Sequence, residues 1–308
     1  MVKRYLLLAG GIGAAKFIEG LMNIVDQEKL DIIVNTGDDI ELFGLQICPD
    51  LDIITYTLAN IVDKNKGWGF SDDTFNCLSS LKGYYNIGWF NLGDNDLATH
   101  IYRTDQYRRG FNKTEITKKI CKKLGVTANL IPMCNEQVET IITIPKKKVH
   151  FEEYYIKYKF KPEILGVNFQ GINNAKPSNS ILRLIKSAAK IIICPSNPIV
   201  SIGTILSVQG IKDALTKVKE KVYGISPIVG GKAIKGPTEK FLRFYNVDSS
   251  CVGVAKHYKS FLGHFIIDKR DSKLKTKIEK LGIKTYCYDI VMKNLEKKKD
   301  LAQFLIKI

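Results

Sequence analysis

A glycine-rich segment near the N-terminus has the composition of a phosphate-binding loop. Residues 10–16 read GGIGAAK and follow an apolar run of strand length at residues 5–9. Glycines let the backbone approach a ligand closely, and a helix that begins there offers free N–H groups and the positive end of its dipole. Neither the P-loop nor the dinucleotide fingerprint matches, since Lys16 stands where the fingerprint needs its third glycine. The segment predicts a phosphate site or, alternatively, a plain strand-to-helix turn, and its candidate ligands are Gly10, Gly11, Gly13 and Lys16.

Two later segments add polar groups of the same kind. Residues 230–236 read GGKAIKG, and a lysine beside glycines is well placed to contact a phosphate, although either lysine could instead be a surface charge. Residues 195–198 read PSNP, in which the prolines fix the backbone and display the side chains between them. A serine hydrolase is excluded, because no partner histidine or nucleophile-elbow pattern accompanies the serine. The candidate ligands here are Ser196, Asn197, Gly230, Lys232 and Lys235.

Adjacent carboxylates in residues 35–39, which read NTGDD, predict a divalent cation site. Hard cations such as Mg²⁺ take oxygen ligands and commonly bind together with substrate phosphates. Asp38 and Asp39 are the expected metal ligands, and Asn35 is expected to contact the phosphate-bearing molecule. The alternative for either carboxylate is a helix cap, because aspartate is a favourable N-cap residue.

Two more acidic pairs predict part of an active-site wall. In residues 49–52, PDLD, the two aspartates share one side if the chain is extended, and Asp52 is expected to cap a helix over residues 53–62. This leaves Asp50 freer for function. In residues 93–100, GDNDLATH, a pair of the same spacing leads into a helix on which Asp96, His100 and Arg103 lie near one face. A lone histidine is usually structural, but one beside acids and an arginine favours a functional site.

Composition narrows the class of protein. The 308 residues are 45% apolar and 25% charged, which is typical of globular proteins. No stretch approaches 18 consecutive apolar residues and no signal peptide is recognisable, so we expect a cytoplasmic protein without a membrane partner. The seven scattered cysteines fit reduced thiols better than disulfides or zinc. The net charge of +16 comes from dispersed lysines without a nucleic-acid motif, so no nucleic-acid partner is expected.

Apolar runs of strand length alternate with helical patterns, which predicts one α/β domain over residues 1–308 with a mainly parallel sheet flanked by helices. The predicted strands are 5–9, 31–35, 130–133, 191–194, 222–226, 264–267 and 284–287. Helices are predicted after Gly13 and over 53–62, 96–108, 114–124, 179–188 and 291–308. Residues 140–151 predict a small β-hairpin, and residues 50–128 a mainly helical insertion. The polar segments follow strands, where open α/β sheets bind their ligands.

Seven segments together resemble the 2-phospho-L-lactate transferase family of deazaflavin coenzyme biosynthesis. They are GGIGAAKF, NTGDD, PDLD, LGDNDLATH, PMCNEQVET, CPSNPIVSIGTIL and SPIVGGKAIKGP. The resemblance implies a Rossmann-like, Mg²⁺-dependent phosphotransferase that acts as a homodimer. Its reaction would move a phospholactyl or phosphoenolpyruvyl group from a guanosine diphosphate-linked donor to the ribityl hydroxyl of 7,8-didemethyl-8-hydroxy-5-deazariboflavin, releasing GMP. The alternative is a nucleotide-sugar-binding regulator of a related family that has no enzymatic activity; the PDLD and LGDNDLATH segments argue against it.

The resemblance also implies roles for the candidate residues. The glycine segments and lysines would hold the guanosine diphosphate, while the acids would hold Mg²⁺ or draw the ribityl proton. The residues implied in catalysis are Asp50, Asp94 and Asp96. The residues implied in binding the acceptor, within the helical insertion, are Asp50, Asp52, Asn95, His100 and Arg103.

Overall fold

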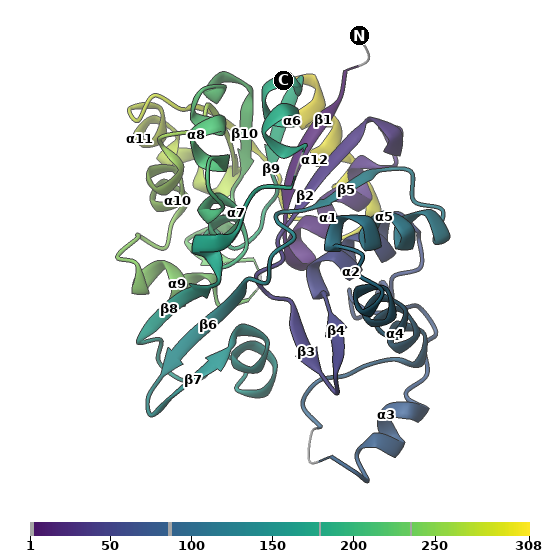
Figure 1. Cartoon of the computed structure of the whole chain (residues 1–308). Helices are drawn as coiled ribbons and strands as arrows, with labels where there is room; N and C mark the ends of the chain where they lie inside the picture. Colours follow the sequence, from purple (N-terminus) through teal and green to yellow (C-terminus); the bar gives the residue numbers. More distant parts are fainter. Residues whose placement is uncertain (1–2, 86–87, 179, 235) are drawn as a thin grey trace.

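Seven parallel strands form the central sheet of the computed structural model, which describes residues 3–85, 88–178, 180–234 and 236–308 (Figure 1). The strand order is β14-β13-β10-β9-β1-β2-β5. All seven strands predicted from the sequence are present. Their bounds are β1 (Tyr5–Ala9), β2 (Leu30–Val34), β5 (Asn129–Pro132), β9 (Lys190–Ile193), β10 (Val222–Ile225), β13 (His264–Asp268) and β14 (Lys284–Tyr288).

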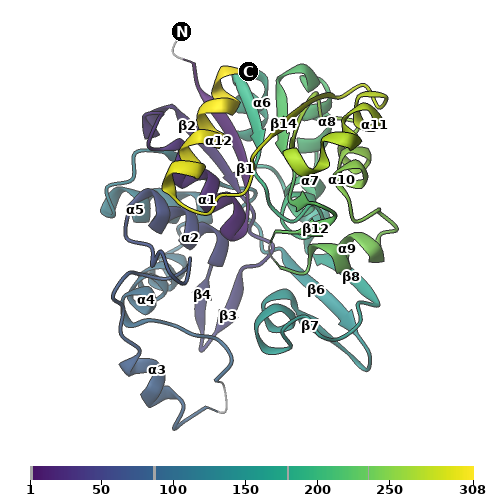
Figure 2. The ribbon, with the colours of Figure 1, turned by 180° about the vertical axis from the view of Figure 1, so that it is seen from behind.

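Helices cover both faces of this sheet because the side chains of each strand alternate between two cores. Leu6 and Leu8 of β1 belong to one core, and Leu7 and Ala9 belong to the other. The first core is covered by α6 (Ile181–Ser187), α7 (Ile202–Ser207), α8 (Ile211–Thr216) and α10 (Cys251–Tyr258). The second is covered by α1 (Gly11–Leu21), α2 (Pro49–Leu58) and α12 (Leu295–Lys307), as Figure 2 shows from behind. This arrangement confirms the Rossmann-like α/β fold.

The strand order reverses next to β1, and this reversal positions the site. From β1 the chain builds outward through β2 and β5 on one side, then returns to β9 on the other side and continues through β10, β13 and β14. The loops that leave β1 and β9 therefore separate at the carboxyl edge of the sheet. Such a topological switch point is where open α/β sheets bind ligands.

Smaller elements extend beyond that carboxyl edge (Figures 1 and 2). A three-stranded antiparallel sheet has the order β7-β6-β8 and confirms the predicted hairpin. Its strands are β6 (Glu139–Ile144), β7 (Lys147–His150) and β8 (Gly166–Gln170). Helices α3 (Asn76–Leu81) and α4 (Asp94–Arg108) also lie here, and a second hairpin joins β3 (Ile40–Leu42) to β4 (Leu45–Ile47). Helix α5 (Lys113–Lys123) instead packs beside β5.

Two helix boundaries differ from the sequence prediction in ways that matter for the site. The helix predicted over 53–62 begins at Pro49, because proline fits the first turn, so Asp52 lies inside the helix and is not its cap. The helix predicted from 291 begins at Leu295, because the Asn294 side chain accepts a hydrogen bond from the Lys297 N–H. Residue 179, where another helix was predicted to begin, lies outside the described residues. Among those described, no helix is both long and apolar enough to cross a membrane.

Candidate functional site

A cavity of about 640 Å³ opens at the topological switch point. One wall combines the N-terminus of α1 with the loop after β9 and with residues 234 and 236–238. Trp68, Phe90 and His100 from the segment 50–128 also line it, as do Phe151, Glu152 and Tyr155 from the segment after β7. The predicted residues that line it are Gly10, Gly11, Gly13, Lys16, Asp38, Asp50, Asp52, Asp96, His100, Ser196 and Asn197. The cavity thus brings together segments from most of the chain.

The glycine-rich segment forms the turn from β1 into α1, and two of its positions leave no room or no favourable backbone conformation for a side chain. Gly11 has φ of +69°, a conformation that residues with a side chain adopt only with strain. A Cβ atom on Gly13 would lie 2.2 Å from the carbonyl oxygen of Pro195 in the loop after β9. Gly10 at the N-cap position has no side chain to cap α1, and of the first N–H groups that of Gly11 donates to Asp50 Oδ1. The N-terminus of α1, with its positive dipole end, lines the cavity. Lys16 lines the same wall, so a phosphate would meet favourable charge here.

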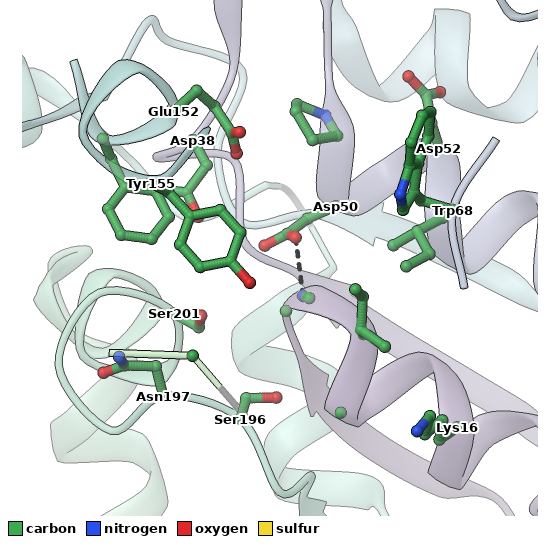
Figure 3. A pocket seen from close by; sticks show the side chains of 18 of the residues that line it. Lys16, Asp38, Asp50, Asp52, Trp68, Glu152, Tyr155, Ser196, Asn197 and Ser201 are labelled. Atoms are coloured by element: carbon green, nitrogen blue, oxygen red, sulfur yellow. Dashed lines mark hydrogen bonds between the residues drawn. The ribbon is translucent and has the colours of Figure 1, made fainter. Parts of the chain in front are cut away.

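Asp38 and Asp50 line the cavity (Figure 3), and the Asn35 side chain beneath them binds both. The Asn35 amide nitrogen donates to Asp38 Oδ2 at 3.0 Å and to Asp50 Oδ2 at 2.9 Å. Asp50 Oδ1 in turn accepts from the Gly11 N–H at 2.7 Å, while Asp38 Oδ1 is buried without a hydrogen-bond partner in the described part of the chain. Burial raises the pKa of Asp50 to about 6, and burial with repulsion from Asp50 raises the pKa of Asp38 well above its ordinary value. Asn35 lies beneath these acids and does not line the cavity.

Asp39 turns away from the cavity, unlike its neighbour Asp38. Its Oδ2 lies 2.5 Å from the Nζ of Lys113 in a buried ion pair, and Asp39 does not line the cavity. Asp38 and Asp39 therefore do not present a shared pair of oxygens to one ligand. The carboxylate that does lie beside Asp38 at the cavity is Asp50, which comes from the first turn of α2.

The acceptor-side acids belong to a buried network on α2 and α4. Arg103 binds both oxygens of Asp52 and lies 3.0 Å from His100 Nδ1, and His100 Nε2 lies 3.4 Å from Asp96 Oδ1. Tyr56 donates to the same Asp96 oxygen at 2.7 Å. Because Asp50 and Asp52 lie on a helix and not on an extended segment, they point to different parts of the site. Arg103 supports this wall from behind, since it does not line the cavity.

Two predicted residues of the GDNDLATH segment lie outside the cavity lining. Asp94 is half-buried and accepts hydrogen bonds from Thr74 Oγ1 at 2.5 Å and from the Cys77 N–H at 3.0 Å; these bonds cap α3 and lower the pKa of Asp94. Asn95 binds Asp73 through its backbone N–H at 2.9 Å and its side chain at 3.0 Å. The structure therefore gives both residues local roles at the base of α3 and α4.

The second glycine-rich segment is a tight hairpin and not an open loop. Strands β11 (Ile228–Val229) and β12 (Lys232–Ala233) pair antiparallel, and Gly230 and Gly231 form the turn at φ of +57° and +74°. Gly230 donates its N–H to Asp271 Oδ2 at 2.9 Å, and Lys232 is exposed and does not line the cavity. Lys235 lies outside the described residues.

In the loop after β9, one polar side chain binds the loop's own backbone and another faces the cavity. Asn197 Oδ1 accepts from the N–H groups of Ile199 at 2.9 Å and Val200 at 3.3 Å, so this oxygen stabilises the turn. Ser196 Oγ is buried, lines the cavity and has no hydrogen-bond partner in the described part of the chain. An unpartnered hydroxyl next to a helix N-terminus is suited to a phosphate oxygen.

Some cavity residues had no signal in the sequence. Glu152 follows β7 and is 8% exposed, and burial together with repulsion from Asp50 raises its pKa to about 8. Trp68 and Phe90 lie in irregular segments, and the segment Ile290, Val291, Met292 and Lys293 lines the cavity before α12. The glycines or polar residues around Trp68 and Phe90 could have suggested that these aromatic side chains contact a ligand. The sequence contains no such indication for Glu152.

Fold and site define a Rossmann-like α/β protein with an acidic ligand site at the topological switch point. The family model for the 2-phospho-L-lactate transferase CofD matches residues 6–302. A phosphoenolpyruvate transferase of Streptomyces griseus is 37% identical, with 99% of this chain and 98% of that protein covered. A 2-phospho-L-lactate transferase of Methanosarcina barkeri is 36% identical, with 98% and 97% covered. This chain belongs to the 2-phospho-L-lactate transferase CofD family.

The fold itself is shared more widely. The crystal structure of a UPF0052 family protein from Bacillus halodurans matches with a TM-score of 0.67 at 14% identity, covering 99% of both chains. At this identity the match supports the architecture alone.

Proposed function

We propose that this protein transfers a phospholactyl or phosphoenolpyruvyl group from a guanosine diphosphate-linked donor to the ribityl hydroxyl of 7,8-didemethyl-8-hydroxy-5-deazariboflavin, releasing GMP. The relatives named 2-phospho-L-lactate transferase and phosphoenolpyruvate transferase support this reaction. The observation that carries the proposal is one cavity lined by the N-terminus of α1, by the aromatic side chains Trp68 and Phe90, and by several acids. No observation favours a regulator without enzymatic activity.

The wall at α1 would hold the donor diphosphate. Backbone N–H groups at the helix start, Lys16 and Ser196 Oγ offer hydrogen bonds and positive charge to phosphate oxygens. These contacts would orient the bond that breaks, so that the departing GMP is already bound when the reaction begins. Trp68 and Phe90, which line the same cavity, would provide flat apolar surface for the deazaflavin ring.

Asp38 and Asp50 would hold Mg²⁺. The buried, unpartnered Asp38 Oδ1 fits this assignment, because a buried carboxylate oxygen without a partner is costly unless a ligand satisfies it. When bound, Mg²⁺ supplies charge neutralisation to the phosphates. Asp50 is the better partner for Asp38 than Asp39 is, since Asp39 is paired with Lys113 outside the cavity lining. Asn35 would fix the spacing between the two ligands.

The decisive experiment incubates the protein with the deazaflavin acceptor and each candidate donor, with Mg²⁺ or with excess EDTA. We expect GMP and the phosphodiester product, measured by chromatography and mass spectrometry, only in the presence of acceptor and Mg²⁺. Comparing the two donors identifies the one used. GMP release at the same rate without acceptor would contradict the transferase proposal and indicate hydrolysis.

Family resemblance further suggests a cytoplasmic homodimer whose ligands are small molecules and not nucleic acid. Light scattering on the purified protein tests the homodimer. The net charge of +16 is the reason to test DNA directly. We expect only weak, strongly salt-dependent binding to random-sequence DNA. Tight binding at physiological salt would contradict this expectation.

A further inference from the structure

Glu152 is a buried carboxyl group that the proposed contacts with donor, acceptor and cation leave unused. It lies directly before the short π-helix η2 (Glu153–Lys157), lines the cavity and is 8% exposed. Its position is fixed, because its backbone N–H donates to His150 Nδ1 at 3.1 Å and the adjoining Tyr154 is fully buried. Figure 3 shows its carboxyl group turned toward the part of the cavity that Asp38 and Asp50 also face.

The other acids that line the cavity are already bound to protein groups. Both Asp50 oxygens accept hydrogen bonds, and one Asp38 oxygen accepts from Asn35. Asp52 is bound by Arg103, and Asp96 by Tyr56. Within the described part of the chain, by contrast, no side-chain or backbone donor contacts the Glu152 carboxyl group.

A carboxyl group buried in this way does not stabilise the fold. Burial without a hydrogen-bond partner or an opposite charge opposes folding, and the nearby Asp50 adds repulsion. A structural role for Glu152 would require a donor or a cation that the described residues do not supply. Its exposure to the cavity therefore points to a group on a substrate.

We propose that Glu152 accepts the proton of the attacking ribityl hydroxyl, an inference that rests on the proposed function. The hydroxyl oxygen forms a bond to the phosphorus on the lactyl or enolpyruvyl side of the donor. The bond from that phosphorus to the bridging oxygen breaks, and its electron pair leaves with that oxygen on GMP. The hydroxyl proton passes to a carboxylate oxygen of Glu152, so charge and atoms balance.

The surroundings make Glu152 an unusually basic carboxylate. Burial and repulsion from Asp50 raise its pKa to about 8 in the empty site. The titratable groups that face it are Asp38, Asp50, His150 and Tyr155. A proton acceptor is most effective when its pKa lies near the working pH.

The test compares Glu152→Gln with Glu153→Gln, a matched control at the neighbouring position. The Glu153 carboxylate pairs with Lys157 at 2.8 Å and does not line the cavity. In Glu152→Gln we expect kcat to fall roughly 10²-fold or more, with little change in donor KM, and the rising limb of kcat with pH to disappear. Glu153→Gln should retain the wild-type kcat and pH profile. GDP binding measured by calorimetry reports that each variant is folded.

A second variant separates chemistry from structure. Glu152→Asp keeps a carboxylate that can accept the proton, although on a shorter side chain. Its kcat should therefore be at least tenfold higher than that of Glu152→Gln. Equal losses in both variants, or a Glu152→Gln enzyme with kcat within twofold of wild type and an unchanged pH profile, would overturn the proposal. Absence of GMP release by the wild-type protein with either donor would instead refute the proposed function itself.

Discussion

Replacing Arg103 with methionine tests how much the buried ion pair between Arg103 and Asp52 stabilises the fold. Arg103 is 3% exposed and binds Asp52 twice, and it also lies 3.3 Å from the Gln46 carbonyl oxygen and 3.0 Å from His100 Nδ1. Methionine keeps much of the apolar stem but leaves the Asp52 carboxylate buried without its counter-charge. Breaking a buried pair by removing one partner costs about 3–5 kcal/mol, so we expect Arg103→Met to lower the free energy of unfolding by that amount.

Arg109→Met, at the end of the same helix, is the matched control. Arg109 Nε lies 2.8 Å from Asp105 Oδ2, but the two side chains are 64% and 46% exposed. Exposed pairs contribute about 0–1 kcal/mol, so this control should lose less than 1 kcal/mol. Both arginines carry one charge and both pair with an aspartate. The difference between the two losses of unfolding free energy therefore measures how much more a buried ion pair contributes than an exposed one.

Guanidinium chloride unfolding monitored by circular dichroism gives the comparison, provided that the m-value is unchanged. Burial already raises the pKa of Asp52, and removing Arg103 raises it further. The folded variant then binds a proton more tightly than the unfolded chain does, so its deficit should be smaller at acidic pH and grow as pH rises. Equal small losses for Arg103→Met and Arg109→Met at neutral pH would refute the reasoning and show that water already screens the Asp52 pair.

Three further predictions follow from the site. The pKa of Glu152 is about 8 in the folded state against an ordinary 4.5, so the free energy of unfolding should fall by up to about 5 kcal/mol as pH rises between these values, and Glu152→Gln should flatten that slope. Gly13→Ala would place a methyl group 2.2 Å from the Pro195 carbonyl oxygen and should weaken GDP binding at least tenfold. In the control Gly44→Ala the added methyl group has no atom within 4 Å, so this variant should lose only the roughly 1–2 kcal/mol of folding stability that its positive φ costs. Excess EDTA should abolish turnover, and Asp38→Asn should raise the Mg²⁺ concentration needed for half-maximal rate; full turnover in EDTA would contradict the magnesium proposal.

The central sheet could be predicted because its strands are short apolar runs that alternate with helical patterns. The β3–β4 hairpin and β8 were missed, since the hairpin strands have only three residues each and all three strands are at most partly buried along their length. The position of a residue on the cavity lining could be predicted where local sequence determines local structure, as at Gly13 in the turn from β1 into α1. The orientation of Asp39 could not be predicted, because its ion-pair partner Lys113 lies 74 positions further along the chain.

Glu152 shows a second limit of sequence-based prediction. It stands beside another glutamate in the stretch FEEYY, and nothing in that stretch distinguishes the two. Only the folded path of the chain buries one at the cavity and leaves the other paired with Lys157 near the surface. Residue type and spacing identify candidate ligands, but tertiary packing decides which carboxylate lacks a partner.

The two acidic walls of the cavity differ in how their charge is balanced. In the network of α2 and α4, the charge of Asp52 is matched by Arg103 without any ligand. On the wall of Asp38, Asp50 and Glu152, repulsion and burial raise all three pKa values, and no cationic side chain in the described part of the chain is paired with any of them. A diphosphate alone would add negative charge beside these acids. Donor and cation should therefore each increase the affinity for the other, because a favourable coupling between two ligands is reciprocal.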